Sequence, residues 1–342
     1  MTHTAVVILN FNGAHFLRAF LPSVIAHSNQ AAIVVVDNGS TDGSQALVRD
    51  HFSTITLLDL GQNWGFCGGY NRALAQIKAD YYVLLNSDVE VTPGWLAPLV
   101  HWLDEHPATA AVQPKIKAQK QKKYFEYAGA AGGFVDALGY PFCRGRIFHH
   151  TEEDAGQYDQ ARPVFWASGA CMVVRASVFH AVGGLDEDYF AHMEEIDLCW
   201  RLNRSGYEVW CLPASHVFHV GGGTLAVGNS QKTYLNFRNG LSLLYKHTRP
   251  GELWWKLPLR VALDWLAALS FARLGAKHTW AVLRAHYHFV KSFGRERNKR
   301  KALATQPYAV TPIYRGSIVR EYYLNGIKRF GELAEARFNN PK

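Results

Sequence analysis

Short apolar runs alternate with longer amphipathic segments along residues 1–90. Four runs rich in Val, Ile and Leu have the length of strands, at residues 5–9, 31–36, 54–58 and 81–85. Between them, segments 14–27, 42–51 and 69–78 repeat apolar positions at the spacing of a helix. The runs lack polar alternation, which indicates strands covered on both faces. The pattern therefore predicts an α/β fold with a doubly wound, mostly parallel sheet joined by right-handed crossovers.

Polar residues follow each predicted strand. Asn10 and Asn12 follow the first strand, residues 37–42 the second, residues 61–71 the third and residues 86–88 the fourth. Ligands of doubly wound sheets bind at the carboxyl ends of the strands, so we expect the functional site there. The first strand is not followed by Gly-x-Gly-x-x-Gly, which disfavours a nicotinamide or flavin enzyme.

Five segments resemble the motifs of one enzyme family. Segments 6–13 and 35–43 resemble the amino-terminal signature of family-2 glycosyltransferases, and segments 63–71, 86–88 and 194–201 match later motifs in the same order. The chain is most similar to the bacterial rhamnosyltransferase-like subgroup, whose tail also carries an Arg-Asn pair such as Arg238-Asn239. The resemblance implies a GT-A fold, a nucleotide-sugar donor, a Mg²⁺ or Mn²⁺ cofactor and inversion at the anomeric carbon.

The donor side of the predicted site begins at Asp37. A carboxylate at a strand end can accept a hydrogen bond from N3–H of uracil or thymine, while Asn38, Ser40 and Asp42 add polar contacts. Residues 40–42 could instead cap a helix, which leaves Asp37 unexplained. Glycines in the 63–71 loop would let its backbone approach the ligand, with a helix beginning near Gly68 pointing its positive end there. The full set of donor-side candidates is Asn10, Asn12, Asp37, Asn38, Ser40, Asp42, Asn63, Gly65, Gly69, Asn71, Asn86 and Arg238.

A metal site is expected at Asp88. Divalent ions that neutralise a diphosphate take oxygen ligands and often need only one or two protein carboxylates. Asn86 replaces the first carboxylate of the family's Asp-x-Asp pattern, and the resemblance offers His219 as a further ligand. The alternatives are a turn at Asp88 and a structural or solvated histidine at His219, which precedes an apparently flexible loop at residues 221–223.

The acceptor side needs a carboxylate to deprotonate the attacking hydroxyl. Glu194, Glu195 and Asp197 are the candidates, and the family's pattern favours Glu195 as the base, where Asp is more frequent. They could instead complement the dipole of a helix over residues 196–203. Small residues around Ser168 and Gly169 would leave room for a sugar; the nearby Trp166 could stack on that sugar or belong to the core.

Composition adds a division of charge. Residues 1–231 hold 15 Lys and Arg against 22 Asp and Glu, whereas residues 232–342 hold 21 against 6. We expect a catalytic domain over 1–230 and a basic, mainly helical region over 231–342, with residues 115–165 irregular apart from one hairpin. Five widely spaced cysteines fit a reducing cytosol, and neither residues 1–17 nor the tail resemble a signal peptide or a membrane span.

The tail also has a regular spacing of basic residues. A stripe of Lys277, Arg284, His288, Lys291 and Arg295, with Trp280, Leu283, Tyr287 and Val290 opposite, predicts a basic amphipathic helix, followed by the charged run 295–301. Such a helix can lie on an anionic membrane surface. It could also pack on the domain with its charges in water. Nucleic acid is disfavoured as a partner because no recognition motif is present.

The family resemblance implies a glycosyltransferase that uses dTDP-rhamnose or a UDP-sugar, and the basic tail would place it on the inner face of the cell membrane. Its acceptor would be a saccharide or a lipid-linked saccharide in cell-surface polysaccharide synthesis. One alternative is a nucleotidyltransferase, which should carry a basic, Gly-rich loop after the first strand; residues 10–18 offer only Arg18. The other is a nucleotide-sugar-binding assembly protein without catalysis. The sequence leaves the oligomeric state open.

Overall fold

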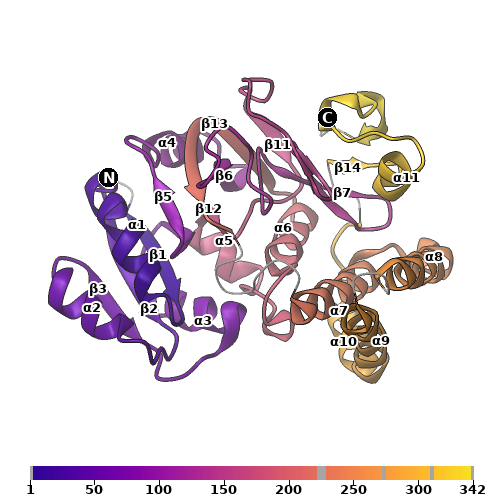
Figure 1. Cartoon of the computed structure of the whole chain (residues 1–342), viewed down its shortest axis with the longest axis horizontal. Coiled ribbons are helices and arrows are strands. Elements are labelled where there is room, and N and C mark those ends of the chain that lie inside the picture. The colour runs from indigo at the N-terminus through magenta and orange to yellow at the C-terminus, as the bar shows by residue number, and fades with distance from the viewer. Residues whose placement is uncertain (1–2, 222–228, 272–274, 309–311, 340–342) are drawn as a thin grey trace.

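A nine-stranded mixed sheet forms the centre of the molecule (Figure 1). The computed structural model describes residues 3–221, 229–271, 275–308 and 312–339. The strand order is β11-β13-β6-β12-β4-β1-β2-β3, with β5 paired to β13. The strands are β1 (Thr4–Asn10), β2 (Ala31–Asp37), β3 (Thr56–Asp59), β4 (Tyr81–Asn86), β5 (Val89–Val91), β6 (Thr109–Ala118), β11 (Arg162–Val164), β12 (Cys171–Arg175) and β13 (Glu208–His219). The first four strands run parallel, which confirms the expected doubly wound half.

Helices cover both faces of this sheet. Alternate residues of β1 point to opposite faces of the sheet. On one face, Val6 and Ile8 pack with α1 (Ala14–His27), α2 (Ser44–His51) and α4 (Ala97–Glu105). Ala5 and Val7 pack on the other side with α3 (Gly65–Leu74), α5 (Ala176–Ala181) and α6 (Glu194–Arg204). Apolar residues on both sides of each strand therefore have a buried place. The α3 helix begins four residues earlier than expected, and the α2 helix two residues later.

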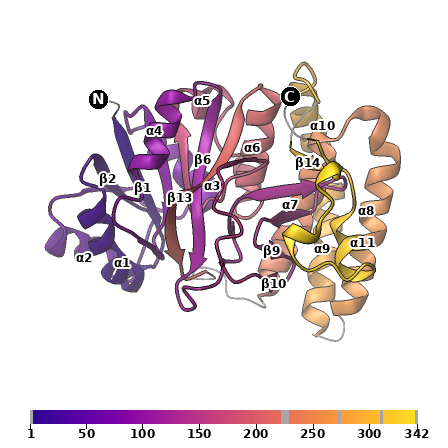
Figure 2. The ribbon, with the colours of Figure 1, turned by 90° about the horizontal axis from the view of Figure 1, so that it is seen from above.

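A second sheet lies where the sequence predicted irregular chain. Its order is β10-β9-β8-β7-β14-β15. The strands are β7 (Gly133–Asp136), β8 (Pro141–Cys143), β9 (Arg146–Ile147), β10 (His150–Thr151), β14 (Ile313–Tyr314) and β15 (Phe338–Asn339). The prediction for residues 115–165 was wrong because these strands are too short to show a period, and two of the six, β14 and β15, come from the chain's end. Figures 1 and 2 place that end, with α11 (Ile318–Tyr323), beside the second sheet.

Four helices form a lobe at the end of the molecule opposite α2 (Figures 1 and 2). They are α7 (Ser230–His247), α8 (Pro250–Phe271), α9 (Ala276–Lys291) and α10 (Phe293–Ala302). The expected basic stripe of α9 does not face water throughout. Arg284 lies over the ring of Tyr234 on α7, and His288 is hydrogen-bonded to the same tyrosine, whereas Trp280 and Tyr287 are exposed. Burial of Ala281 and Ala285 against α7 sets this rotation of the helix.

Part of the basic tail neutralises the acidic catalytic body. Lys299 on α10 contacts Asp186 and Asp188 at 2.6 Å, and Arg295 contacts Asp188 at 2.9 Å. Lys246 on α7 contacts Asp186 at 2.8 Å. The opposite charges of the two regions therefore hold them together, and only part of the tail's charge is turned outward.

The described helices include none long and apolar enough to cross a membrane. All five cysteines are buried and unpaired by disulfides.

Candidate active site

The polar residues expected at one sheet edge do meet there. Asn10 and Asp37 lie side by side as the last residues of β1 and β2, and Asn86 ends β4 next to Leu9. The 86–88 segment then turns into β5, whose partner β13 brings His219 opposite Val89. The ends of the parallel strands β1, β2 and β4 and the end of the antiparallel pair β5 and β13 thus meet at one edge of the sheet.

Asp37 and Asn10 each present an enclosed oxygen without a partner. Asp37 Oδ1 accepts a hydrogen bond from the Ser40 N–H at 2.8 Å, but its Oδ2 has none. Asn10 Nδ2 donates to Ser40 Oγ at 3.2 Å, while its Oδ1 has no partner. Buried oxygens without donors are unfavourable, so these two atoms are the donor-side groups best suited to receive N–H or O–H groups from a ligand.

Three further donor-side candidates brace the loops around that point. Asn12 has a left-handed backbone (φ 51°) and accepts from the Thr41 N–H at 2.8 Å. Ser40 Oγ accepts from the Asn12 N–H at 2.9 Å. Asp42 accepts from the Ala14 N–H at 2.8 Å and the Ser44 N–H at 3.1 Å, so it caps two helices at once. Burial disfavours its charge, yet these hydrogen bonds lower the pKa of Asp42 overall.

The 63–71 loop needs a correction. Both polar atoms of the Asn38 side-chain amide are bonded within the protein. Nδ2 donates to Gly65 O at 3.0 Å, and Oδ1 accepts from the Trp64 N–H at 3.0 Å. Asn63 Oδ1 accepts from the Gly65 N–H at 2.8 Å. We therefore assign Asn38 and Asn63 to shaping the loop instead of binding the donor directly.

Gly65, Gly69 and Asn71 also serve packing. A Cβ on Gly65, which has φ +72°, would lie 2.6 Å from the Phe190 ring, and one on Gly69 would lie 2.8 Å from Leu9. Asn71 donates to Leu185 O at 2.8 Å and accepts from its N–H at 2.9 Å. Their close contacts are with protein groups, contrary to the expectation of ligand contacts.

Asp88 and His219 form the expected pair. Both side chains are buried, and His219 Nε2 lies 3.1 Å from Asp88 Oδ1 and 3.4 Å from Asn86 Nδ2. On its other side, His219 Nδ1 lies 3.2 Å from Glu126 Oε2, a charge contact without the alignment of a hydrogen bond. Burial opposes charge on His219, but Glu126 and Asp88 outweigh it and raise the pKa of His219 to about 10. Burial likewise opposes charge on Asp88, but His219 lowers its pKa.

This pair fits a divalent ion. Two ligand atoms about 2.1 Å from one ion and at right angles are about 3 Å apart, close to the Asp88–His219 separation. A carboxylate behind the histidine, here Glu126, is the usual support of a metal-binding imidazole. Among the described residues no group of three or more His, Cys, Asp and Glu side chains could hold an ion alone. An ion would therefore need oxygens from a bound ligand as well.

Glu194 and Glu195 begin α6, as expected of the catalytic carboxylates. Glu194 is 5% exposed and Glu195 is partly buried, and each has an enclosed Oε2 without a hydrogen-bond partner. Burial raises the pKa of Glu195 to about 7. Burial, followed by repulsion from Glu195, raises the pKa of Glu194 well above its usual range. A carboxyl group poised near neutrality suits a general base.

One short segment joins this base to the metal pair. The Asn86 N–H donates to Ala170 O at 3.0 Å. A Cβ on the adjacent Gly169 would lie 3.9 Å from Glu195 Cβ. Glu195 and the 86–88 turn thus lie against the same two residues, Gly169 and Ala170, and the acceptor-side role of Gly169 stays a prediction.

Asp197 lies where it braces α6, which disfavours the predicted catalytic role. It is fully buried and contacts Lys246 at 2.5 Å, His247 at 2.8 Å and Arg201 at 2.9 Å. Burial opposes its charge, but Lys246 and Arg201 hold the pKa of Asp197 well below its usual range. The carboxylate fixes α6 to α7 and is inaccessible to an acceptor.

The Arg-Asn pair holds the backbone in front of Glu194. Asn239 Nδ2 donates to the carbonyls of Ala191 and His192 at 2.9 and 2.7 Å. Arg238 donates to the carbonyls of Asp188 and Tyr189 at 2.8 and 3.0 Å, so it positions this loop instead of binding the donor. The loop is strained, with φ of 65°, 68° and 71° at three non-glycine residues, Phe190, His192 and Met193. Strain of this kind persists only where the surroundings enforce it, and it is common beside active sites.

Trp166 belongs to the core. Its ring packs on Gly133 and its Nε1 donates to Phe134 O at 3.0 Å, so it cannot stack on a sugar as one interpretation proposed. Ser168 is 1% exposed, and its Oγ accepts from the Ala170 N–H at 3.2 Å. It shapes the turn that carries Gly169.

Sequence reasoning missed Glu126. It lies in the segment between β6 and β7, in no motif, and nothing in its neighbourhood in the sequence indicated a role. The predicted loop at 221–223 lies outside the described residues beyond Gly221.

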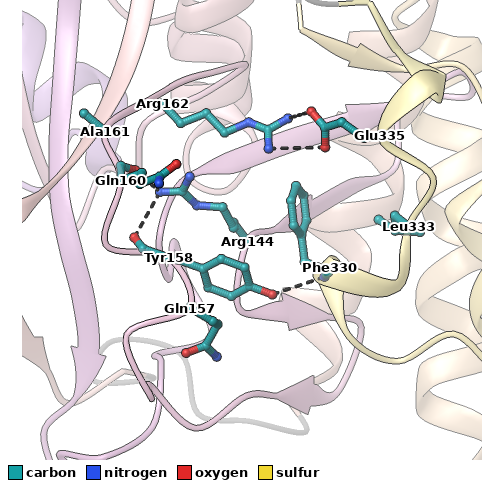
Figure 3. Close-up of a pocket in the computed structure, with 10 residues that line it drawn as sticks. Arg144, Gln157, Tyr158, Gln160, Ala161, Arg162, Phe330, Leu333 and Glu335 are labelled. Carbon is teal, nitrogen blue, oxygen red and sulfur yellow. Dashed lines mark hydrogen bonds and ion pairs between the residues drawn. The ribbon is translucent and has the colours of Figure 1, made fainter.

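A separate cavity of about 310 Å³ lies between the second sheet and the chain's end (Figure 3). Its basic groups already have partners. Arg144 donates to the carbonyls of Tyr158 and Gln160, and Arg162 pairs with Glu335. None of the site residues above lines it, so we assign this cavity no part in the reaction.

Residues 5–183 match the sequence model described as glycosyl transferase family 2. The chain belongs to this family. It is 28% identical over 279 residues to N-acetylglucosaminyl-diphospho-decaprenol L-rhamnosyltransferase of Mycobacterium tuberculosis, which covers 77% of this chain and 90% of that protein. It is 23% identical over 221 residues to rhamnosyltransferase WbbL of Escherichia coli K12, covering 63% of this chain and 82% of that protein. The rhamnosyltransferase-like resemblance of this family-2 glycosyltransferase is thereby confirmed.

Solved structures confirm the GT-A fold. GalNAc-T7 with UDP, GalNAc and Mn²⁺ superposes with a TM-score of 0.59 at 14% identity, over 92% of this chain and 59% of that one. The mannosyltransferase PcManGT of Pyrobaculum calidifontis, in complex with GDP-Man and Mn²⁺, gives a TM-score of 0.50 at 15% identity, over 89% and 86% of the two chains.

Proposed function

We propose that this family-2 enzyme is a metal-dependent, inverting transferase that moves a sugar from a nucleotide diphosphate to a saccharide or lipid-linked saccharide. One observation carries the proposal: Glu195, whose pKa is raised to about 7, and the Asp88–His219 pair flank the same segment at the carboxyl edge of the sheet. Direct displacement requires a base and a diphosphate site on opposite sides of the reacting sugar.

Asp88 and His219 would hold a Mg²⁺ or Mn²⁺ ion together with oxygens of the donor. Such an ion stabilises the negative charge of a departing diphosphate. Glu126 keeps the His219 ring in place from behind. Asn86, the departure from Asp-x-Asp, is near enough to His219 to offer its amide oxygen after a flip of the side chain.

Glu195 would take the proton of the acceptor hydroxyl as that oxygen attacks the anomeric carbon. Its ionised form is the active one, so the reaction needs a pH near or above 7. Glu194, more deeply buried, keeps its proton longer and reduces the repulsion that a second ionised carboxyl would exert.

The donor is proposed to be dTDP-rhamnose, with UDP-sugars as the second class. The names of two relatives support rhamnose. Asp37 Oδ2 supports a pyrimidine with an N3–H donor, because that enclosed oxygen has no partner within the protein.

The outer face of α8 supports contact with the inner membrane surface. Six apolar side chains on one face of this helix are turned outward, with exposed fractions of 40% to 76%. They are Trp254, Trp255, Leu259, Trp265, Leu266 and Leu269. The inward face instead buries the ion pair of Arg260 and Asp264. A helix with its apolar face outward and aromatic rings among that face is suited to the headgroup region of a bilayer.

Sedimentation with vesicles tests this surface. We expect the wild type to bind vesicles containing phosphatidylglycerol, and Leu266→Ser combined with Leu269→Ser to bind at least tenfold more weakly. The matched control is Leu324→Ser, at a residue 79% exposed outside α8. Equal binding by both variants would remove the membrane from the proposal.

Transfer itself is tested with a panel of nucleotide sugars, with Mg²⁺, Mn²⁺ or chelator, in the wild type and Glu195→Gln. Donor turnover that needs the metal and Glu195 supports the enzyme. Binding of a nucleotide sugar by the wild type without turnover of any donor would favour the assembly protein.

A further inference from the structure

Arg146 on β9 is a buried guanidinium with an unused hydrogen-bond donor. The residue is 6% exposed, and its Nε is enclosed without a partner. Its Nη2 contacts only a weak acceptor, Cys143 Sγ, at 3.2 Å. A buried charged donor without an acceptor is costly, which indicates a place for an acceptor that the protein does not supply.

Lys232 on α7 brings a second positive charge to the same place. Both cations lie near the centroid of the Tyr127 ring, at 4.5 Å for the Arg146 guanidinium carbon and 5.8 Å for Lys232 Nζ. Burial and then repulsion from Arg146 lower the pKa of Lys232, despite attraction to Glu126. Tyr127 is 44% exposed, so the side chain that covers the two cations is also the one that opens to solvent.

The neighbouring negative charge is already shared. Glu126 contacts His219 and accepts from the Ala128 N–H at 2.5 Å. Glu126 attracts both Arg146 and Lys232 while it is already a partner of His219. One shared carboxylate neutralises the two cations only in part, which suits an added anion.

The two cations share their electrostatic surroundings with the proposed base. Cys143, which Arg146 touches, has a pKa raised by burial and also by Glu126 and Glu195, so both carboxylates act at this position. Lys232 acts on His192, where burial and then this lysine's charge lower the pKa to about 4. His192 lies two residues before Glu194 in the chain.

We infer that Arg146 and Lys232, covered by Tyr127, form a subsite for a phosphate group of a substrate, most directly the diphosphate of a lipid-linked acceptor. The role of this subsite in the reaction depends on the proposed glycosyl transfer, whereas its ability to bind phosphate does not. A guanidinium beside an ammonium is the pair of donors that phosphate oxygens bind best. Unlike Arg146, the arginines that line the cavity of Figure 3 already have hydrogen-bond or ion-pair partners.

Steady-state kinetics separate the sources of the phosphate. The probes are the nucleotide-sugar donor, N-acetylglucosamine on a short alkyl diphosphate and the same sugar on an uncharged alkyl chain. For Lys232→Gln we expect KM of the diphosphate acceptor to rise about tenfold more than KM of the uncharged one. If KM rises about tenfold for the nucleotide-sugar donor and not for the diphosphate acceptor, the subsite binds a phosphate of the donor. Equal effects on both acceptors, with no effect on the donor, would overturn the subsite.

Binding without turnover separates this inference from the proposed function. Calorimetry with butyl diphosphate, without metal or donor, should give a Kd about tenfold weaker for Lys232→Gln than for the wild type. Arg146→Lys, which keeps the charge and removes Nε, should also weaken binding; if it fails to fold, Lys232→Gln decides. The control is Lys78→Gln, an exposed lysine beyond the far end of α3, which should bind as the wild type does. Tight binding lost in Lys232→Gln upholds the subsite even if no donor is turned over, and unchanged binding refutes it.

Discussion

Replacing Glu195 with glutamine should inactivate the enzyme and at the same time stabilise it at alkaline pH. The carboxyl is partly buried, its Oε2 has no hydrogen-bond partner, and its pKa is about 7 against 4.5 for an exposed glutamate. Ionising it in the folded protein is therefore unfavourable. Glutamine has nearly the same shape and never carries this charge.

The magnitude follows from the shift. A difference of about 2.5 pKa units corresponds to at most about 3 kcal/mol of unfolding free energy. Because the folded pKa is the higher one, the folded state binds the proton more tightly. Wild-type stability is thus highest below pH 4.5, falls between pH 4.5 and 7, and stays lowered above that. The Glu195→Gln variant lacks this decline.

The assay is urea unfolding of both proteins at pH 5 and pH 8, with transfer rates measured on the same samples. The advantage of Glu195→Gln should grow by about 2.5 kcal/mol between the two pH values, because part of the wild-type decline has already occurred at pH 5. Its turnover should fall about 10² to 10⁴-fold, the usual contribution of a general base. In the wild type, kcat/KM should decline below pH 7.

The matched control is Glu194→Gln, which removes the neighbouring buried carboxyl and keeps the proposed base. It should retain more activity than Glu195→Gln. Full activity in Glu195→Gln, or a stability difference that does not change with pH, would refute the reasoning about this residue.

Three other changes test the surroundings of the base. Asp88→Asn, or removal of divalent ions with chelator, should abolish transfer, and only the chelated wild type should recover when Mn²⁺ is added back, as product formation would show. Asp197→Asn should lower the unfolding free energy by about 3–5 kcal/mol, because it leaves Lys246 and Arg201 buried without their counter-charge; an unchanged melting temperature would contradict that network. Gly65→Ala should cost at least about 2 kcal/mol in urea unfolding, since its backbone is left-handed and its Cβ would meet the Phe190 ring; a loss under 0.5 kcal/mol, on the order expected of a surface change, would show that the loop can shift.

The catalytic half of the fold could be predicted because its signals are local. Strands buried on both faces appear as unbroken runs of Val and Ile, and β1, β2, β3 and β4 were each found within two residues of their ends. The second sheet could not be predicted, because its strands are two to four residues long and β7 pairs with β14, which is far away in the chain. Pairing of that kind leaves no period in the sequence.

The site divides in the same way. Motif positions singled out Asp88, His219 and Glu195, to which the proposed function gives the metal and base roles. The same motifs contain Asn71, Asp197 and other residues that hold the loops, and spacing alone cannot distinguish a carboxylate that faces solvent from one enclosed by Lys246 and Arg201. Glu126 and Arg146 lie in no motif, and only the fold brings them to the site.

The stereochemistry of the product tests the central claim most directly. Once the donor panel yields a substrate, NMR of the transferred sugar gives its anomeric configuration. A base and a diphosphate site on opposite sides of the sugar predict the configuration opposite to that of the donor. A product that keeps the donor's configuration would contradict direct displacement assisted by Glu195.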